Sequence, residues 1–309
     1  MTTALVLGAN GQDGSYLSEI LCARGQDVVG VGRQPRPRWP VSSGKYRYQT
    51  CDISDTDTLQ AILRLVSPDI VFHFAAIHGA AGFDYESVWR EVQLVNTVSV
   101  HAVLEYIRGE KPSCGLVYAS SAKVFGAPLP ARISETTPRK SSCIYSITKN
   151  AGHALIDYYR ARHAAKASVL YLFNHESPRR APEFFIPRLA EALKRALLDG
   201  GKSEIYSLDF CCDWGDAREY MEIAADIAER ALGEDFVLAT GKTWTGREMA
   251  GQLFARHGLD LADHLIETAP ASSMQSLYQA SNAKLRARLG RAPMRSILDV
   301  FDEFLQAAL

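Results

Sequence analysis

The chain has 309 residues, enough for one large domain or two closely joined ones. Apolar residues make up 47% and charged residues 22%, which argues against extensive disorder, and the net charge of −1 gives no basic footprint for nucleic acid. No apolar run reaches the ~18 residues that a membrane span needs, and the first residues show no signal-peptide pattern. We therefore expect a cytoplasmic protein with neither a nucleic-acid nor a membrane partner.

Short apolar strands and amphipathic helices alternate over more than half of the chain. The pattern predicts strands at 3–7, 27–31, 46–51, 70–74, 115–119 and 168–173, and helices at 15–24, 59–66, 88–107 and 144–162. Strands that alternate with helices form right-handed βαβ units. The sequence therefore predicts an α/β fold with a Rossmann-type doubly wound parallel sheet.

The pattern changes near Asn174. A loop at 177–182 precedes a predicted helix at 185–198, and shorter elements lead to an amphipathic helix near the C-terminus, whose apolar positions are Ile297, Val300, Phe301, Phe304 and Leu305. We expect a dinucleotide-binding domain at 1–173, with a return of the chain to it near 205–233. Residues 174–309 would form mainly a smaller, substrate-binding lobe at one edge of the sheet.

The cysteines and histidines do not suggest a metal site. The six cysteines include no C-x-x-C pair, and the eight histidines show no H-x-x-x-H spacing. Reduced thiols and the absence of a bound metal are the expectation.

A glycine-rich turn joins the first predicted strand to the first helix. Residues 8–14 read G-x-x-G-x-x-G. Glycine at these positions permits a tight turn and a close approach of backbone to a pyrophosphate, while the helix N-terminus offers free N–H groups and a favourable dipole. The position of the motif, after a strand and before a helix, predicts a dinucleotide site.

The end of the second strand suggests which dinucleotide is bound. An acid that would hold the ribose 2′-hydroxyl of NAD is missing from Val31-Gly32-Arg33, and Arg36 and Arg38 follow in a proline-rich loop at 34–40. A guanidinium group suits a 2′-phosphate, so we expect NADP, with NAD as the less favoured cofactor. A solvent-facing arginine is the alternative. Asp52, after the third strand, is placed to meet the adenine edge.

A Y-x-x-x-K pair formed by Tyr145 and Lys149 opens the predicted helix at 144–162, and Ser120-Ser121 end the preceding strand. This order of serine, tyrosine and lysine along the chain is that of the short-chain dehydrogenase/reductase family, which the chain resembles over nearly its whole length. The resemblance implies that Ser121 binds the substrate oxygen and that Tyr145 carries the proton. Lys149 would hold the nicotinamide ribose and lower the pKa of the tyrosine.

Five further segments carry a closer resemblance, to GDP-mannose 4,6-dehydratases: 11–17, 135–138, 173–180, 213–215 and 235–241. That family implies an extended Rossmann fold, NADP, a GDP-sugar site between the lobes, and a homodimer or homotetramer. By analogy, the helices at 88–107 and 144–162 would form the dimer contact.

The motifs and the resemblance together predict two sets of binding residues. Cofactor contacts are expected at Gly8, Asn10, Gly11, Gln12, Asp13, Gly14, Arg33, Asp52, Ile53, Phe74, Ala75, Ala76, Tyr145, Lys149, Leu172, Asn174 and His175. Substrate contacts are expected at His78, Lys123, Asn174, Glu176, Arg179 and Arg188.

The chain departs from the dehydratase pattern at the base. A dehydratase removes a proton from C5 of the sugar, and the family has a glutamate two residues after the catalytic hydroxyl residue. Lys123 occupies that position here. A lysine acts as a base near pH 7 only if its pKa falls by about 3, at a cost of roughly 4 kcal/mol. A salt bridge or a contact with substrate phosphate is the simpler role for Lys123.

Three departures concern the nucleotide-sugar half of the site. Cys212 replaces an arginine before Asp213-Trp214, a later family arginine falls near Ala271, and His78 replaces a serine unless a one-residue gap aligns it with the histidine that follows. Of the remaining cations, Arg179, Arg180 and Arg188 are candidates for holding an anion. They would equally suit the surface or, for Arg180, an oligomer contact.

Three hypotheses remain. The first is an NADP-dependent reductase of a 4-keto-sugar nucleotide, with C4 epimerisation as a variant that uses the same residues. The second is a true dehydratase in which Glu135 or Glu176 replaces the missing base. The third is a non-catalytic NADP-binding sensor, against which the complete set of Ser121, Tyr145 and Lys149 argues.

Overall fold

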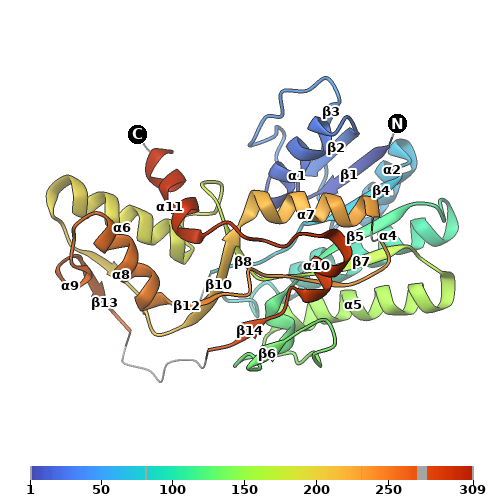
Figure 1. Ribbon diagram of the computed structural model, residues 1–309. Coiled ribbons are helices and arrows are strands. Elements are labelled where there is room, and N and C mark those ends of the chain that lie inside the picture. Colours follow the sequence, from blue (N-terminus) through green and yellow to red (C-terminus); the bar gives the residue numbers. More distant parts are fainter. Residues whose placement is uncertain (1, 81, 231, 270–276, 308–309) are drawn as a thin grey trace.

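A seven-stranded parallel sheet forms the centre of the larger lobe (Figure 1). The computed structural model describes residues 2–80, 82–230, 232–269 and 277–307. The strands run in the order β11-β7-β5-β4-β1-β2-β3. Their bounds are β1 Thr3–Leu7, β2 Asp27–Gly32, β3 Tyr46–Thr50, β4 Ile70–His73, β5 Gly115–Ser121, β7 Ala167–Leu172 and β11 Phe236–Leu238. The order reverses between β1 and β4, so the predicted doubly wound Rossmann-type sheet is confirmed.

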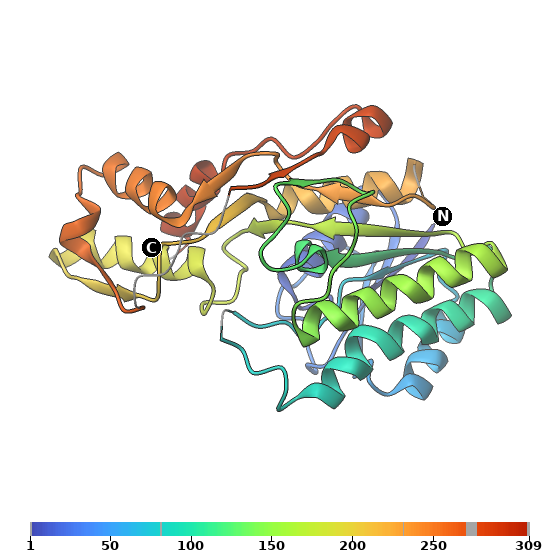
Figure 2. The same ribbon diagram turned by 90° about the horizontal axis from the view of Figure 1, so that it is seen from below.

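Helices cover both faces of this sheet (Figures 1 and 2). One face carries α2 Thr56–Val66, α3 Trp89–Gln93, α4 Ser99–Gly109 and α5 Ile144–His163, and the other carries α1 Gln12–Ala23, α7 Ala217–Arg230 and α10 Ala283–Leu289. Alternate residues of a strand point to opposite faces, so Leu5 and Leu7 join one core while Ala4 and Val6 join the other. Burial on both faces explains why the strands are almost continuously apolar.

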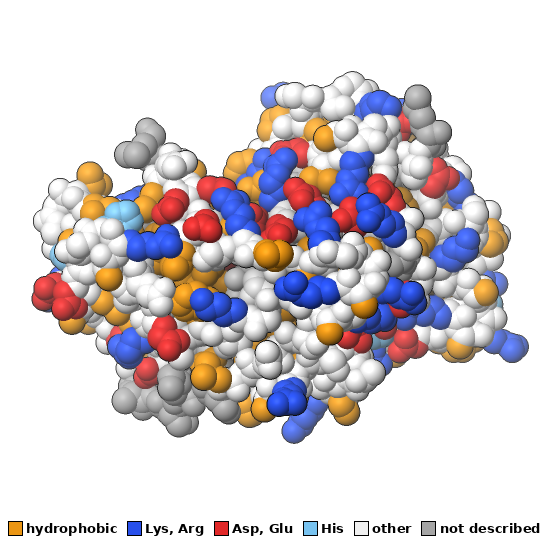
Figure 3. Space-filling view, viewed as in Figure 1, with side chains coloured by type: hydrophobic (Ala, Val, Ile, Leu, Met, Phe, Trp, Pro, Cys, Tyr) orange, Lys and Arg blue, Asp and Glu red, His pale blue; other side chains and the backbone are white. Residues whose placement is uncertain are grey.

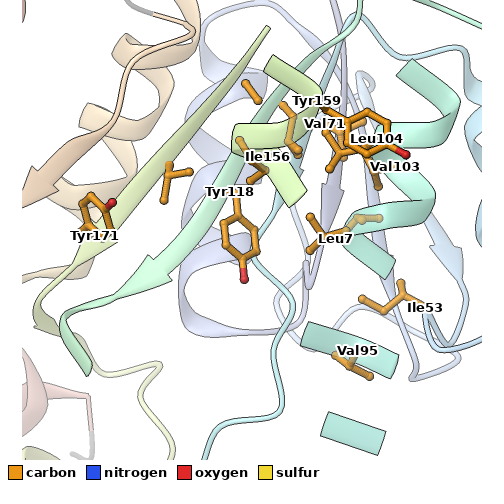
Figure 4. Close-up of a cluster of buried hydrophobic side chains, with 14 of the residues drawn as sticks. Leu7, Ile53, Val71, Val95, Val103, Leu104, Tyr118, Ile156, Tyr159 and Tyr171 are labelled. Atoms are coloured by element: carbon orange, nitrogen blue, oxygen red, sulfur yellow. The ribbon is translucent and has the colours of Figure 1, made fainter. Parts of the chain in front are cut away.

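The core between the sheet and α5 fixes the helix that carries the Y-x-x-x-K pair. Figure 4 shows Ile156 of α5 and Val103 and Leu104 of α4 around Val71 of the sheet, with Leu7 below them in the view. All five side chains are buried. Each contributes about 1.5–3 kcal/mol through burial, so the position of α5 over the sheet is strongly determined.

The predicted helix at 88–107 is divided into three parts. A π-helical turn, Leu94–Val98, separates α3 from α4. Buried Asn96 lies in this turn; its amide oxygen accepts a hydrogen bond from the Ile77 backbone N–H, and its amide nitrogen donates to Thr148 Oγ1. The extra residue in the turn therefore places one polar side chain where it joins the loop after β4 to α5.

Other helix boundaries differ from the prediction by a few residues. Helix α1 begins at Gln12, within the glycine-rich turn, rather than at residue 15. Helix α2 begins at Thr56, because the carboxylate of Asp55 caps it by accepting a hydrogen bond from the Thr58 N–H.

The smaller lobe lies beyond the carboxyl ends of the strands of the large sheet, where β8 follows β7 directly in the chain (Figure 1). A three-stranded sheet in the order β12-β10-β8 packs with helices around its own core, which includes Trp214, Trp244, Phe254 and Phe301. The bounds here are β8 Asn174–Glu176, α6 Phe185–Asp199, β10 Cys211–Asp216, β12 Thr243–Thr245, α8 Gly246–Arg256 and α11 Ile297–Gln306. Short pairs join β9 Ser203–Ile205 to β13 Leu265–Glu267, next to α9 Leu261–His264, and β6 Arg132–Ile133 to β14 Gln279–Ala280. Within this part of the sequence, α7 and β11 return to the large sheet.

Within the described part of the chain, no helix combines the length and apolar character needed to cross a bilayer. On the face seen in Figure 3, basic and acidic side chains are interspersed over α7 and its neighbours, where Arg24 and Arg291 both pair with Asp226.

Candidate active site

The glycine-rich turn packs directly against the loop that follows β4. Gly8 has a φ of +92°, and a Cβ there would lie 2.7 Å from the backbone nitrogen of Ala75. A Cβ on Gly14 would lie 2.3 Å from the carbonyl oxygen of Gly8. The first turn of α1 and the turn before it are thus as close as two backbones can be, and only glycine fits at either position.

This geometry fits the pyrophosphate of a dinucleotide. The first N–H groups of α1 have no intrahelical acceptor, and they open at the carboxyl edge of the sheet, where α/β folds bind nucleotides. Of the predicted cofactor residues, the structure brings to this edge Gly8, Gly11, Gln12, Asp13, Gly14, Phe74, Ala75, Ala76, Tyr145, Lys149, Leu172 and His175. On the far side of the turn lie Arg33, Asp52 and Ile53, at the ends of β2 and β3.

Tyr145 and Lys149 lie on the first turns of α5, beside the end of β5. Lys149 is fully enclosed, and its Nζ donates a hydrogen bond of 2.8 Å to the carbonyl oxygen of Ala119. That nitrogen lies 5.8 Å from the centre of the Tyr145 ring. Ser121 ends β5 beside Leu172 of β7, and its hydroxyl caps the 3₁₀ turn Ala122–Phe125. The structure therefore gathers the three residues that the sequence motif predicted.

The expected lowering of the Tyr145 pKa is wrong. Burial raises the pKa of Tyr145 well above its usual range, and nearby Tyr85 raises it further, while a hydrogen bond with Ser121 offsets only part of the increase. Burial also lowers the pKa of Lys149 to about 7, against a smaller opposite effect of Asp13. The Tyr145 phenol therefore keeps its proton at neutral pH.

Two other predicted residues lie next to Tyr145. The His78 ring stacks on the Tyr145 ring at a centroid distance of 4.6 Å, and its Nδ1 lies 2.8 Å from the Tyr85 hydroxyl. Burial holds the pKa of His78 well below its ordinary value, so the ring is neutral. The Lys123 ammonium lies 5.8 Å from the centre of the Tyr145 ring. Although this side chain is exposed, protein atoms around it partly desolvate the ammonium group and lower its pKa.

Glu176 is a buried acid with incomplete pairing. It lies on β8, is 2% exposed, and one of its carboxylate oxygens has no hydrogen-bond partner among the described residues. The nearest cation, Nε of Arg180, lies 3.6 Å away, beyond a normal hydrogen bond. Burial raises the pKa of Glu176, with Arg180 opposing that effect. Asn174, two residues earlier, is exposed.

The three candidate anion-binding arginines have different surroundings. The guanidinium of Arg179 pairs with Glu19 on α1, donates to Ser15 Oγ and stacks over the Tyr16 ring. The guanidinium is thus already engaged by α1, and contact of Arg179 with the substrate stays a prediction. Arg188 and Arg180 instead line a cavity of about 580 Å³ beside α6, together with Lys194. The departure expected near Ala271 lies outside the described residues.

A polar network joins the glycine-rich turn to the smaller lobe. The Gln12 side chain donates to the His175 carbonyl oxygen and accepts from Ser177 Oγ, and Asp13 Oδ1 lies 2.9 Å from His175 Nε2. Burial alone would lower the pKa of His175, but Asp13 outweighs it and the net pKa is raised. Burial likewise opposes ionisation of Asp13, yet His175 lowers its pKa overall. The two residues form a partly buried ion pair.

The ion pair predicts a pH-dependent contribution to stability. Because the pKa of His175 is raised in the fold, the protonated histidine stabilises the fold fully at pH values below 6.5. That stabilisation is lost as the pH rises through the folded pKa of His175. Because the pKa of Asp13 is lowered in the fold, this carboxylate stabilises the fold at pH values above 3.8. That stabilisation is lost as the pH falls through the folded pKa of Asp13. We expect His175→Gln to cost about 1 kcal/mol more in free energy of unfolding near pH 5.5 than near pH 9. Urea denaturation at the two pH values measures this difference in free energy of unfolding. The control His257→Gln, at an exposed site, should show no such difference. If His175→Gln lost the same free energy of unfolding at both pH values, the charged pair would be contradicted.

Glu135 is not placed to act as a base at Tyr145. Its carboxylate accepts a hydrogen bond from the Val237 N–H, and it lines a separate cavity of about 310 Å³ with His153, Asp157 and Asp235. The histidine and the two aspartates are close enough to hold a metal ion. However, Arg160 pairs with both aspartates and Arg139 pairs with Asp157, so two guanidinium groups already balance the two carboxylates, and the cluster fastens α5 to the start of β11.

The sequence analysis missed two residues of this region. Tyr85, which holds His78, lies in an irregular segment without a motif, so no local pattern could have identified it. Trp39 lies in the noted loop at 34–40, where its ring meets the guanidinium of Arg179 at 5.0 Å. An aromatic residue amid prolines and arginines was the only available signal.

Comparison with known proteins agrees with this geometry. The family model of GDP-mannose 4,6 dehydratase matches residues 5–292. The chain belongs to this family. GDP-mannose 4,6 dehydratase 2 of Caenorhabditis elegans is 30% identical over 84% of this chain and 71% of its own length. The GDP-mannose 4,6-dehydratase of Vibrio cholerae is 30% identical over 79% of this chain and 69% of its own.

Solved structures related to the family share the fold. UDP-glucose 4-epimerase from Thermotoga maritima, solved with UDP-glucose, has a TM-score of 0.84 at 20% identity, over 99% of this chain and 98% of that one. A dTDP-glucose 4,6-dehydratase from Bacillus anthracis, solved with NAD, has a TM-score of 0.83 at 18% identity, over 99% and 96%.

Proposed function

We propose that this protein is an NADP-dependent oxidoreductase that reduces the ketone of a 4-keto-sugar nucleotide. The observation that carries the proposal is the Lys123 ammonium 5.8 Å from the centre of the Tyr145 ring, where the dehydratase motif has a carboxylate. An ammonium group that keeps its proton does not remove a proton from sugar carbon. Reduction of a carbonyl needs no such base, and the residues that reduction requires are all present.

The protonated state of Tyr145 suits this direction. When bound, the nicotinamide cofactor supplies the hydride. The Tyr145 phenol, held protonated by burial, then donates its proton to the oxygen that develops negative charge. Ser121, at the end of β5, would donate a hydrogen bond to the same oxygen, and Lys149 would hold the nicotinamide ribose. Gly8 and the N-terminus of α1 would hold the pyrophosphate.

The substrate would lie between the two lobes. His78 stacks on Tyr145 and offers a neutral imidazole, and Glu176 offers a carboxylate oxygen without a partner among the described residues. These groups suit sugar hydroxyls. Arg188 and Lys194, at the cavity of about 580 Å³, carry the positive charge that a diphosphate needs. The exposed Trp89 of α3 and Ile147 of α5 support a homo-oligomer formed through these helices.

Dehydration is the second candidate function, because Glu176 is a buried carboxylate with a raised pKa. A carboxylate of this kind accepts a proton at neutral pH more readily than an ordinary glutamate. Glu176 is therefore the residue that would replace the missing base.

Two incubations separate the candidates. Purified protein is incubated with GDP-mannose and NADP, and separately with the corresponding 4-keto, 6-deoxy sugar nucleotide and NADPH, and each product is analysed by mass spectrometry. We expect the GDP-mannose mass to stay unchanged and the keto sugar to gain two hydrogens as NADPH is consumed. Loss of one water from GDP-mannose would overturn the reductase proposal and direct attention to Glu176.

A further inference from the structure

A loop of unpaired arginines follows β2. Arg33, Arg36 and Arg38 are all exposed, and none of them takes part in an ion pair with another described residue. This is where the adenosine ribose lies in dinucleotide-binding folds. Arg33 lies close enough to Asp52 to lower the pKa of that carboxyl, whereas Arg36 and Arg38 have no carboxylate partner among the described residues. Such cations suit a phosphate dianion, but a flexible loop would pay a large entropic cost to hold them together. The loop therefore needs contacts that fix its conformation.

Asn10, in the glycine-rich turn, is bonded to this loop at three residues. Its Nδ2 donates to Gln34 Oε1 at 2.7 Å and to the Arg36 carbonyl oxygen at 3.4 Å, and its Oδ1 accepts from the Arg38 N–H at 2.9 Å. Nδ2 also donates to the Tyr48 hydroxyl at 2.8 Å. The amide nitrogen is thus engaged by the loop and by Tyr48, and the amide holds the loop. Direct contact of Asn10 with the cofactor stays a prediction.

Tyr48 on β3 completes the attachment. Its hydroxyl donates to the Gln34 carbonyl oxygen at 2.8 Å, so this phenol joins the loop to both Asn10 and the sheet. The space is filled: a Cβ on Gly32 would lie 2.6 Å from the Tyr48 oxygen and 3.2 Å from Asn10 Nδ2. Gly32 is thus required for the network to form.

The other end of the loop is held by the smaller lobe. Trp39 lies under the guanidinium of Arg179, which in turn stacks on Tyr16 of α1 at 4.0 Å. Glu19 fixes the same guanidinium. The arginine segment is therefore held at Asn10 on one side and at Trp39 on the other.

We infer that Asn10 and Tyr48 are positioning residues that fix the Arg33–Arg38 loop for the 2′-phosphate and so set the preference for NADP over NAD. The inference rests on the NADP preference in the proposed function. It assigns to Asn10 a role in discrimination between the two cofactors, separate from binding of the pyrophosphate that they share.

Binding titrations with NADPH and NADH test this inference without a substrate. Tyr48→Phe removes one hydroxyl and keeps the ring, and Asn10→Ala removes the amide. We expect NADPH to bind about five- to tenfold more weakly to each variant, consistent with the loss of one or two hydrogen bonds that preorganise the loop, with NADH affinity changed less than about twofold. Arg47→Ala, which removes an exposed cation next to Tyr48 on β3, should leave both affinities unchanged.

The outcomes separate this inference from the proposed function. If the wild-type protein bound NADH as tightly as NADPH, the NADP preference in the proposed function would be overturned. A wild-type preference that survives in both variants would overturn the positioning role alone. Equal weakening of NADPH and NADH would also overturn it, because Asn10 and Tyr48 would then act through the pyrophosphate turn. Circular dichroism at matched temperature confirms that each variant is folded.

Discussion

Tyr145→Phe is expected to reduce turnover by about 10²- to 10⁴-fold, the range for loss of a positioned general acid. The substitution removes only the hydroxyl. The ring keeps its stack against His78 at 4.6 Å and its burial at 5% exposure, so the fold should be retained. Lys149 keeps its hydrogen bond to Ala119 and with it the proposed place for the ribose. Cofactor affinity should therefore change by less than about twofold while chemistry nearly stops.

The matched control is Tyr158→Phe on the same helix. Tyr158 is 58% exposed and faces away from the site, so this variant should keep full turnover. Steady-state rates with the substrate identified by mass spectrometry, together with a fluorescence titration of NADPH, give both quantities. Unchanged turnover in Tyr145→Phe would show that the proton comes from another group, and His78 would be the first to examine.

The fold was predictable because its signals are local. Six of the seven strands of the large sheet, and the helices between them, follow from apolar runs and periodicity within about a dozen residues, and the right-handed crossover rule then fixes their arrangement. The short edge strand β11 was not predicted. The place of Tyr145 followed in the same way, since a motif that opens the helix after β5 must lie at the carboxyl edge of the sheet. The π-helical turn was not predictable, because it depends on Asn96 meeting Thr148, 52 residues later.

The surroundings of several site residues depend on partners far along the chain. Arg179 was predicted to contact the substrate, and its local sequence could not show that Glu19, 160 residues earlier, engages its guanidinium. Glu135 was a candidate base until its hydrogen bond to Val237 placed it elsewhere. The direction of the Tyr145 pKa shift depends on how completely the tertiary structure excludes water. Residue type and spacing indicate which chemistry is available, but not which partner a charged side chain already has.

Gly14→Ala is expected to lower the free energy of unfolding by about 2–3 kcal/mol, as overpacking against fixed atoms does, and to weaken cofactor binding by more than about tenfold. A Cβ at this position would lie 2.3 Å from the Gly8 oxygen, 2.8 Å from the Gly8 carbonyl carbon and 2.9 Å from Ala9 Cα. All three are backbone atoms of the turn, so no side chain can rotate away. Either α1 or the turn must move, and the N–H groups that face the pyrophosphate move with it.

Gly251→Ala separates this steric effect from the general effect of alanine in a helix. Gly251 lies inside α8, and a Cβ there meets nothing within 4 Å. Alanine should therefore stabilise the protein by about 0.5–1 kcal/mol and leave cofactor binding unchanged. Thermal or urea denaturation and an NADPH titration on both variants make the comparison. If Gly14→Ala were as stable as wild type and bound NADPH as tightly, the contact between α1 and the turn would not determine cofactor binding, and the pyrophosphate would have to bind elsewhere.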